Sequence, residues 1–211
     1  MYPCLKLKYL EGILGQIDGF ERPKVGLEQY VTPSHLASHM LYMIQSQYDE
    51  ITDKIIGDFG SGCGALTIGA STLKASYVIG FEVDQEAIDI ALCNLDDLDV
   101  NTIDFINCDV RNISKRFSKF FDTIIMNPPF GTKNNQGMDV LFLEKAFEMA
   151  KSSVYSLHKT STREFILKTA KLNGVKAEVL AELKYDLPAT LKFHRKKTVD
   201  VEVDFIRFTM V

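Results

Sequence analysis

Short apolar runs alternate with glycine turns and helical patterns from residue 54 onward, and this alternation constrains the fold most. The runs at residues 55–59, 77–83, 102–106 and 121–127 each have the length of a buried strand. Strands that alternate with helices favour a parallel sheet, because each right-handed crossover needs a connecting helix to return the chain. The sequence therefore predicts an α/β fold, in which ligands bind beyond the carboxyl ends of the strands.

The pattern differs in the last third of the chain. Helical patterns at residues 139–151 and 162–172 flank a further short strand, and two long strands follow at residues 176–185 and 198–208. The last of these, TVDVEVDFIRF, alternates apolar and polar residues, which is typical of an antiparallel strand with one wetter face. We therefore expect a Rossmann-like, doubly wound, mostly parallel sheet of seven strands with an antiparallel last strand.

A chain of 211 residues is close to the size of one domain, and no linker or repeat divides it. We predict a single domain over residues 1–211, with residues 1–50 as a helical N-terminal extension. The net charge of −4 argues against a protein that coats nucleic acid through bulk charge, but it does not exclude a local basic patch. The four cysteines form no C-x-x-C pair, so the sequence predicts no metal site.

The first predicted strand ends in Asp58-Phe59-Gly60-Ser61-Gly62-Cys63-Gly64. Glycines at alternate positions let the backbone turn sharply and approach a ligand closely. The spacing differs from the G-x-G-x-x-G of nicotinamide enzymes, and no G-K-[ST] ending indicates a triphosphate site. Taken alone, the segment is explained equally well as a tight connection between a strand and a helix.

An acid, Glu82, lies at the end of the second predicted strand, with Asp84 close behind it. A carboxylate here can accept hydrogen bonds from both ribose hydroxyls of a nucleotide-like ligand. Its distance of about two dozen residues from the glycine turn fits one strand–helix–strand unit. Alone, the two acids are better explained as solvated loop residues, but the glycine turn reverses that preference.

The most specific motif, Asn127-Pro128-Pro129-Phe130, ends the fourth predicted strand. Two prolines fix the backbone and remove two N–H donors, which leaves the asparagine oxygen and exposed carbonyls as acceptors. With an aromatic ring beside them, these acceptors suit an N–H donor that lies flat against that ring. A plain turn at the end of a strand does not easily explain this combination.

Basic residues gather in the run from Lys192 to Lys197, which also contains Arg195, Lys196 and an aromatic Phe193. Such a patch in an acidic protein is suited to follow an RNA backbone, although a solvated turn explains it equally well. Lys133, which follows the Asn-Pro-Pro-Phe motif, is also placed to meet a substrate phosphate.

The Asp-x-Gly-x-Gly-x-Gly turn, the acid of the second strand and Asn-Pro-Pro-Phe together resemble class I methyltransferases that methylate amines with S-adenosylmethionine. Longer blocks resemble the eukaryotic methyltransferase-like protein five family over residues 16–208: GQIDGFERPKVGLEQYVTPSHLA, IIMNPPFGTKNNQGMD, VYSLHKTSTRE and YDLPATLKFHRKKTVDVEVDFIRF. The resemblance implies a class I methyltransferase fold and one N6-methyladenosine in small-subunit (18S) ribosomal RNA as product. It also implies a heterodimer with a small zinc-containing activator subunit.

The same resemblance assigns roles to individual positions. It implies that the N-terminal extension closes over the cofactor. The residues implied in catalysis are Asn127, Pro128, Pro129 and Phe130, and those implied in cofactor binding are Gln29, Thr32, Asp58, Gly60, Gly62, Cys63, Ala65, Glu82, Asp109 and Val110. Two positions depart from the family pattern, because Ser61 replaces a frequent cysteine and Glu82 stands where many relatives carry aspartate.

The expected chemistry follows from the acceptors of the motif. The Asn127 side-chain oxygen and the Pro128 carbonyl would accept the two amine hydrogens of the base, which favours a nitrogen with a localised lone pair. Phe130 would stack on the base, which must be flipped out or unpaired to reach such a pocket. The leaving group is neutral, so no general acid is needed.

The third predicted strand, at residues 102–106, is expected to be an edge of the sheet. Its apolar edge invites pairing with another chain, which fits the activator subunit that the resemblance implies. No apolar stretch reaches the roughly 18 residues of a membrane span, and the first 12 residues lack the apolar core of a signal peptide. We expect the protein in the nucleus, including the nucleolus, and in the cytoplasm.

Two other functions compete with an RNA adenine methyltransferase. A protein glutamine methyltransferase that acts on a release factor is the first, because a side-chain amide also presents two N–H groups to an Asn-Pro-Pro site. Such enzymes commonly carry tyrosine where this chain has Phe130. A non-catalytic scaffold is the second, and the complete glycine turn and Asn-Pro-Pro-Phe motif argue against it.

Overall fold

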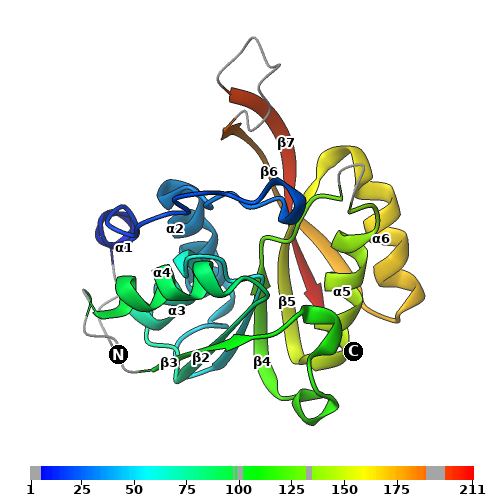
Figure 1. Ribbon diagram of the computed structural model, residues 1–211. Helices are drawn as coiled ribbons and strands as arrows, with labels where there is room; N and C mark the ends of the chain where they lie inside the picture. Colours follow the sequence, from blue (N-terminus) through cyan, green and yellow to red (C-terminus); the bar gives the residue numbers. More distant parts are fainter. Residues whose placement is uncertain (1–5, 97, 99–101, 132–134, 189–197) are drawn as a thin grey trace.

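A seven-stranded sheet forms the centre of the computed structural model, which describes residues 6–96, 98, 102–131, 135–188 and 198–211 (Figure 1). The strands are β1 (Ile55–Phe59), β2 (Tyr77–Glu82), β3 (Ile103–Asn107), β4 (Phe121–Met126), β5 (Ala150–Lys159), β6 (Lys176–Pro188) and β7 (Thr198–Thr209). The helices are α1 (Leu7–Leu14), α2 (Ser34–Met43), α3 (Ala65–Thr72), α4 (Gln85–Asp96), α5 (Met138–Met149) and α6 (Arg163–Leu172).

The strand order is β3-β2-β1-β4-β5-β7-β6. The first five strands pair in parallel, whereas β7 lies antiparallel between β5 and β6. The predicted mixed sheet of seven strands with an antiparallel last strand is therefore confirmed. Strand β3 lies at an edge of the sheet, as the sequence predicted.

The strand order reverses between β1 and β4, and this is where the chain forms a ligand-sized crevice. Within the ladder, Phe59 of β1 pairs with Phe81 of β2 and with Met126 of β4. The residues that follow these positions, Gly60, Glu82 and Asn127, therefore emerge side by side at one edge of the sheet.

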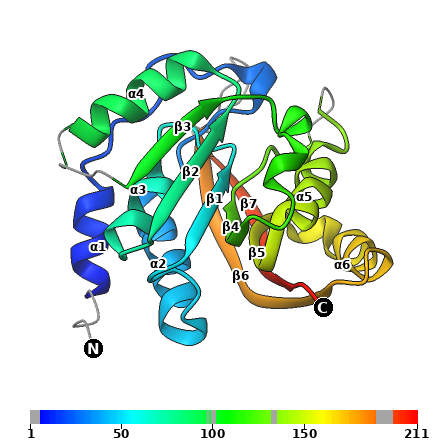
Figure 2. The same ribbon diagram turned by 90° about the horizontal axis from the view of Figure 1, so that it is seen from below.

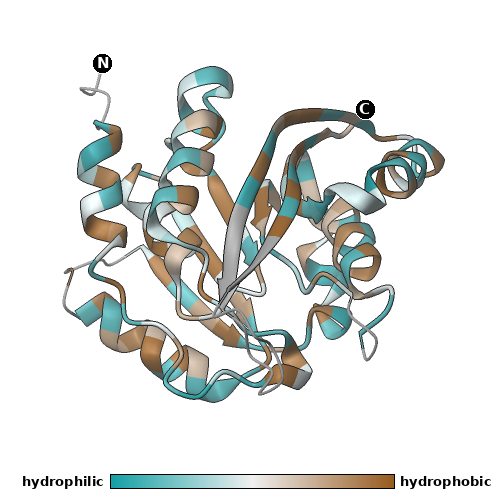
Figure 3. Ribbon diagram, turned by 90° about the horizontal axis from the view of Figure 1, so that it is seen from above, coloured by the Kyte–Doolittle hydropathy of each residue, from teal (hydrophilic) through white to brown (hydrophobic). Residues whose placement is uncertain are grey.

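Helices cover both faces of the sheet (Figure 2). One apolar core lies between the sheet and helices α1, α2 and α3, and it includes Leu10, Leu41 and Ile68. The other lies between the sheet and helices α5 and α6, and it includes Leu143 and Ile166. Bands of apolar and polar residues alternate along the paired strands β6 and β7, as a ribbon with two different faces requires (Figure 3).

The two helices of the N-terminal extension are short. Helix α1 begins at Leu7 and ends at Leu14, where the Gly15 N–H donates to the Glu11 carbonyl and the Gln16 N–H donates to the Ile13 carbonyl. Helix α2 ends at Met43, and a single π-helical turn continues the chain over Ile44–Tyr48. Among the described residues, no helix is both long and apolar enough to cross a membrane.

An ionic contact fastens the end of the N-terminal region to the sheet. Glu50 lies after α2, and its carboxylate accepts a hydrogen bond of 2.6 Å from Arg207 of β7. Tyr155 of β5 donates its hydroxyl to the same carboxylate, and the Arg207 guanidinium lies 4.3 Å from the ring centroid of Tyr48. These contacts join the segment after α2 to β5 and β7, which lie beyond the point where the strand order reverses.

Helix α3 approaches α2 closely at Gly69, and this contact predicts the effect of an added methyl group. A Cβ at Gly69 would lie 2.3 Å from Cδ1 of Leu41, which is fully buried. We expect Gly69→Ala to lower the free energy of unfolding by about 1–3 kcal/mol, because the packed core must shift. Urea denaturation measures the change.

Gly12 of α1 is the matched control. No atom lies within 4 Å of a Cβ built at Gly12, so Gly12→Ala should raise the free energy of unfolding by about 0.5–1 kcal/mol through helix propensity alone. Equal changes in the free energy of unfolding for the two substitutions would show that the close approach of α2 and α3 does not affect the stability of the fold.

Candidate active site

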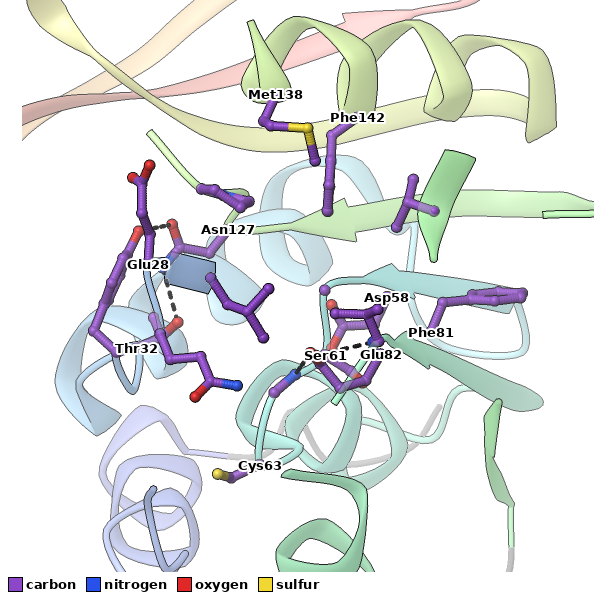
Figure 4. A pocket seen from close by; sticks show the side chains of 18 of the residues that line it. Glu28, Thr32, Asp58, Ser61, Cys63, Phe81, Glu82, Asn127, Met138 and Phe142 are labelled. Carbon is purple, nitrogen blue, oxygen red and sulfur yellow. Dashed lines mark hydrogen bonds between the residues drawn. The ribbon is translucent and has the colours of Figure 1, made fainter. Parts of the chain in front are cut away.

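A cavity of about 430 Å³ lies at the carboxyl ends of β1, β2 and β4. Residues 20–32, which we call the strap, cross this end of the sheet and form one wall. Figure 4 shows Glu28, Thr32 and Asn127 on one side of the cavity, and Asp58, Ser61 and Glu82 on the other. The volume falls within the range of small-molecule and cofactor sites.

The turn between β1 and α3 forms the floor of the cavity and needs its glycines. Gly60, Gly62 and Gly64 have positive φ angles of 76°, 53° and 92°, a conformation that other residues rarely adopt. The N–H of Gly60 donates to the Phe81 carbonyl at 2.8 Å, so β2 supports the turn. A Cβ at Gly62 would lie 3.1 Å from the ring of Phe20 in the strap.

Glu82 fixes this turn from the end of β2. Its carboxylate accepts backbone N–H bonds from Gly62 at 2.9 Å, from Val83 at 2.9 Å and from Asp84 at 3.0 Å. Burial raises the pKa of Glu82, although the three backbone bonds act against that shift. The carboxylate lines the cavity in one fixed orientation and still has acceptor capacity for a ligand.

Asp58, which is among the residues that line the cavity, has one carboxylate oxygen without a hydrogen-bond partner. Its Oδ2 accepts a hydrogen bond of 2.6 Å from the Thr67 hydroxyl, whereas its Oδ1 is buried without a partner. Burial raises the pKa of Asp58 from 3.8 to about 7, against the opposing effect of Thr67. A positively charged group that enters the cavity would therefore find a carboxylate oxygen with no other partner.

Asp84 holds the strap against the body of the protein. Its carboxylate accepts hydrogen bonds of 2.7 Å from the Lys24 ammonium and of 2.7 Å from the Gln29 amide. Burial acts to raise the pKa of Asp84, but the bonds from Lys24 and Gln29 hold it below its ordinary value. The strap is thus tied to the end of β2, and Gln29 lies at the cavity wall.

A second tie joins the strap to the segment before α5. The Asn135 side-chain amide donates to the Gly26 carbonyl at 2.9 Å and to the Glu28 carboxylate at 3.0 Å. Glu28 itself has a positive φ of 53°, which is unusual for a residue other than glycine. The strap therefore spans from the β2 end to the β4 end of the cavity.

The Asn127 side chain is held at both ends of its amide by the strap. Its Nδ2 donates to the Thr32 hydroxyl at 3.0 Å, and its Oδ1 accepts from the Tyr30 hydroxyl at 3.0 Å. Phe130 is only 5% exposed and packs against Tyr30, with ring centroids 5.7 Å apart. Asn127 and Pro129 line the cavity, whereas Pro128 and Phe130 are not part of its lining.

The structure brings the predicted cofactor residues together. The ten positions come from four separate regions of the sequence, and all of them line the one cavity: Gln29, Thr32, Asp58, Gly60, Gly62, Cys63, Ala65, Glu82, Asp109 and Val110. Their roles in binding stay predictions. The predicted RNA-contacting residues Lys133, Lys192, Arg195, Lys196 and Lys197 lie outside the described residues.

Sequence reasoning missed several residues of this site. Phe20, Met138 and Phe142 supply apolar walls, and Tyr30 covers the Asn-Pro-Pro-Phe motif. Tyr30 lies between Gln29 and Thr32, two positions that the sequence did single out, so an aromatic residue between them was the available signal. In the described part of the chain, no group of three His, Cys, Asp or Glu side chains could hold a metal ion.

Comparison with known proteins assigns the class. The methyltransferase small domain family matches residues 36–157, which is more than half of the chain. The crystal structure of PH1948 from Pyrococcus horikoshii superposes with a TM-score of 0.87 at 38% identity and covers 98% of both chains. The rRNA N(6)-adenosine-methyltransferase METTL5 of Danio rerio is 55% identical over 97% of this chain and 99% of its own length. The chain therefore belongs to the methyltransferase small domain family and, within it, to the METTL5 family.

The alternative enzyme class is a more distant match. A release factor glutamine methyltransferase of Fusobacterium nucleatum is 30% identical over 61% of this chain and 36% of its own length. The similarity to METTL5 of Danio rerio, by contrast, extends over nearly the whole chain.

The buried Asp58 predicts a pH dependence of stability that Asp58→Asn removes. The folded protein binds a proton at Asp58 more tightly than the unfolded chain does, since the pKa is about 7 rather than 3.8. The contribution of Asp58 to the free energy of unfolding therefore decreases as the pH rises from about 4 to about 7, by about 1.4 kcal/mol for each unit of pKa difference.

Urea denaturation of the ligand-free protein at several pH values measures this effect. The free energy of unfolding of Asp58→Asn minus that of the wild type should increase between about pH 4 and about pH 7 and stay constant above that range. Parallel pH curves for the two proteins would contradict a raised pKa at Asp58.

Proposed function

We propose that this protein transfers a methyl group from S-adenosylmethionine to N6 of one adenosine in small-subunit (18S) ribosomal RNA, in a complex with a small zinc-containing activator subunit. As a member of the METTL5 family it is an RNA adenine-N6 methyltransferase. The observation that carries the proposal is the Asn127 amide, which is fixed at the cavity edge next to the glycine turn.

The residues of the cavity fit S-adenosylmethionine. The unpaired Oδ1 of Asp58 suits the positively charged ammonium of the methionine part, and the glycine turn leaves room for a close backbone contact. Glu82 suits the ribose hydroxyls, while Asp109 and Val110 lie where the adenine ring would be held. The strap, which includes Gln29 and Thr32, would close over the bound cofactor.

The bound cofactor supplies a methyl group on a positively charged sulfur that leaves as a neutral thioether. The chain supplies the orientation of the amine. The Asn127 oxygen and the Pro128 carbonyl accept the two N–H groups of the adenine, so its lone pair is localised and points at the methyl group. Thr32 keeps the Asn127 oxygen, rather than its NH₂ group, turned to the substrate. The surplus proton of the methylated amine leaves to water.

We also propose that the basic run between β6 and β7 binds the RNA backbone, with Lys192, Arg195, Lys196 and Lys197 as its phosphate contacts and Lys133 as a further one. The support comes from the strands on either side. Strand β6 runs in the same direction as the parallel strands, because β7 is antiparallel to both β5 and β6. Strand β6 therefore ends, and β7 begins, at the cavity end of the sheet, and Figure 1 shows both strands reaching past the strap.

The activator subunit is proposed to pair with the free edge of β3. Hydrogen bonds from Val78 N–H to the Thr102 carbonyl and from Cys108 N–H to the Glu82 carbonyl show that the even-numbered residues of this segment face β2. The backbone groups of residues 103, 105 and 107 therefore point away from the sheet and can accept another strand. Half-buried Phe105 and Ile106 add an apolar surface.

Asn127→Ala tests the proposed chemistry. With labelled S-adenosylmethionine, total ribosomal RNA and the activator subunit, the wild type should place label in N6-methyladenosine. The variant should lose about 10²- to 10³-fold in rate while it still binds the cofactor, because the amine acceptor is gone. The exposed Asn112→Ala is the control and should keep full activity. Label in a release factor instead of RNA would show that the enzyme methylates a glutamine of that protein and not an adenosine of RNA.

Asn107→Pro tests the proposed partner edge. Proline removes the outward N–H of residue 107 without breaking the ladder to β2, so the complex with the activator subunit should be lost in size-exclusion chromatography. Asn107→Ala removes the same side chain but keeps the N–H, and it should still form the complex. An intact complex of Asn107→Pro would exclude pairing at this end of β3.

For the location of the protein we propose the nucleus, including the nucleolus, and the cytoplasm. The proposed substrate supports this, since small-subunit ribosomal RNA is present in both. Fluorescence microscopy of the tagged full chain tests it, and exclusion from the nucleus would contradict it.

A further inference from the structure

Tyr30 of the strap contacts both groups that the proposed mechanism reserves for the substrate. Its hydroxyl donates to Asn127 Oδ1 at 3.0 Å, the oxygen proposed to accept the amine of adenine. Its ring lies 5.7 Å from the ring of Phe130 with an interplanar angle of 31°. One side chain thus combines a hydrogen-bond donor with an aromatic ring, as an adenine does.

The distance between the two rings decides whether a base can bind beside Tyr30. Aromatic rings in direct contact have centroids about 4.5–7 Å apart, so no third ring fits between Tyr30 and Phe130. Phe130 is almost fully buried in this arrangement. A base that stacks on Phe130 on the Tyr30 side therefore requires Tyr30 to move.

We propose that Tyr30 occupies the target-base site of the substrate-free enzyme and that a flipped-out adenine enters by displacing it. The base would replace two contacts of Tyr30 by contacts of the same kind, namely a hydrogen-bond donor to Asn127 and a ring against Phe130. This inference rests on the proposed roles of Asn127 and Phe130.

The contacts around Tyr30 permit this exchange without loss of the catalytic geometry. Thr32 holds the NH₂ group of Asn127, so the amide keeps its orientation when Tyr30 leaves. Glu28, two residues before Tyr30, has a left-handed backbone conformation that is disfavoured for glutamate. A change of the strap at Glu28 relieves this strain and offers a route by which Tyr30 swings out.

A side chain that must first be displaced lowers the apparent affinity for every base by the same factor. The reason is that only the fraction of the enzyme with an open site binds a base. Such a side chain therefore acts on the KM for RNA and not on the rate of the chemical step. Until a base arrives, Tyr30 also keeps water away from the Asn127 oxygen. The site is thus protected without a separate lid.

Tyr30→Phe separates this role from a direct catalytic one. The variant keeps the ring and loses the hydrogen bond to Asn127. The free-energy difference between the open and the closed state therefore shifts toward the open state by the contribution of one neutral hydrogen bond. We expect the KM for ribosomal RNA to fall about two- to tenfold, with kcat and cofactor affinity unchanged. The control is Tyr9→Phe on α1, where the tyrosine is 60% exposed and far from the cavity.

A fluorescence measurement tests the movement itself. The chain contains no tryptophan, so Tyr30→Trp introduces a single reporter next to Phe130. Its emission should shift to longer wavelength when ribosomal RNA is added with S-adenosylhomocysteine, because the indole moves into water. The same substitution at Tyr9 should give no shift.

Two results would overturn the proposal. A fall in kcat of Tyr30→Phe at unchanged KM would mean that the hydroxyl stays on Asn127 during the reaction. An unchanged KM of Tyr30→Phe, together with an unchanged indole emission of Tyr30→Trp at saturating RNA, would mean that Tyr30 does not leave. Full activity of Asn127→Ala is a different failure, since it would remove the proposed function itself.

Discussion

The carboxylate of Glu82 is the contact on which the site depends. It binds three backbone N–H groups at the ends of β1 and β2, and it thereby fixes the glycine turn relative to the sheet. Asp84, two residues further along, uses the same strand end to hold the strap through Lys24 and Gln29. One strand terminus thus organises both the floor and the wall of the cavity. A glutamate suits this task because its longer side chain reaches Gly62 across the turn.

The cavity and the Asn-Pro-Pro-Phe motif form two halves that the strap joins. The half proposed to bind the cofactor consists of residues from β1, β2 and the segment after β3. The half proposed to bind the substrate has Asn127 and Phe130, which Thr32 and Tyr30 contact. The strap therefore contacts both halves at once, through Gln29 and Thr32 at the cavity wall and through Tyr30 on the motif.

The sequence predicted the fold well because strand and helix patterns are local. The seven strands and the antiparallel β7 follow from runs of apolar residues and their alternation with polar ones, whereas the edge position of β3 was expected from the strand order usual in the methyltransferase class that the sequence resembles. The roles of the expected cofactor residues stay predictions, but the gathering of most of them at one cavity could be predicted, because all except Gln29 and Thr32 lie at or just after the ends of strands. The bond between Tyr30 and Asn127 could not, because 97 residues separate the partners and no local pattern links them. The same holds for the contact of Lys24 with Asp84 and for the burial of Phe130.

The long separation between the strap and its contacts also sets an order of assembly during synthesis. Residues 20–32 leave the ribosome well before Asp84, Asn127 and Asn135, the residues to which they attach. Contacts of such high sequence separation form late, since the loop between them must close first. The active site is therefore completed only after the central sheet exists, and a nascent chain has no closed site until β4 has been added.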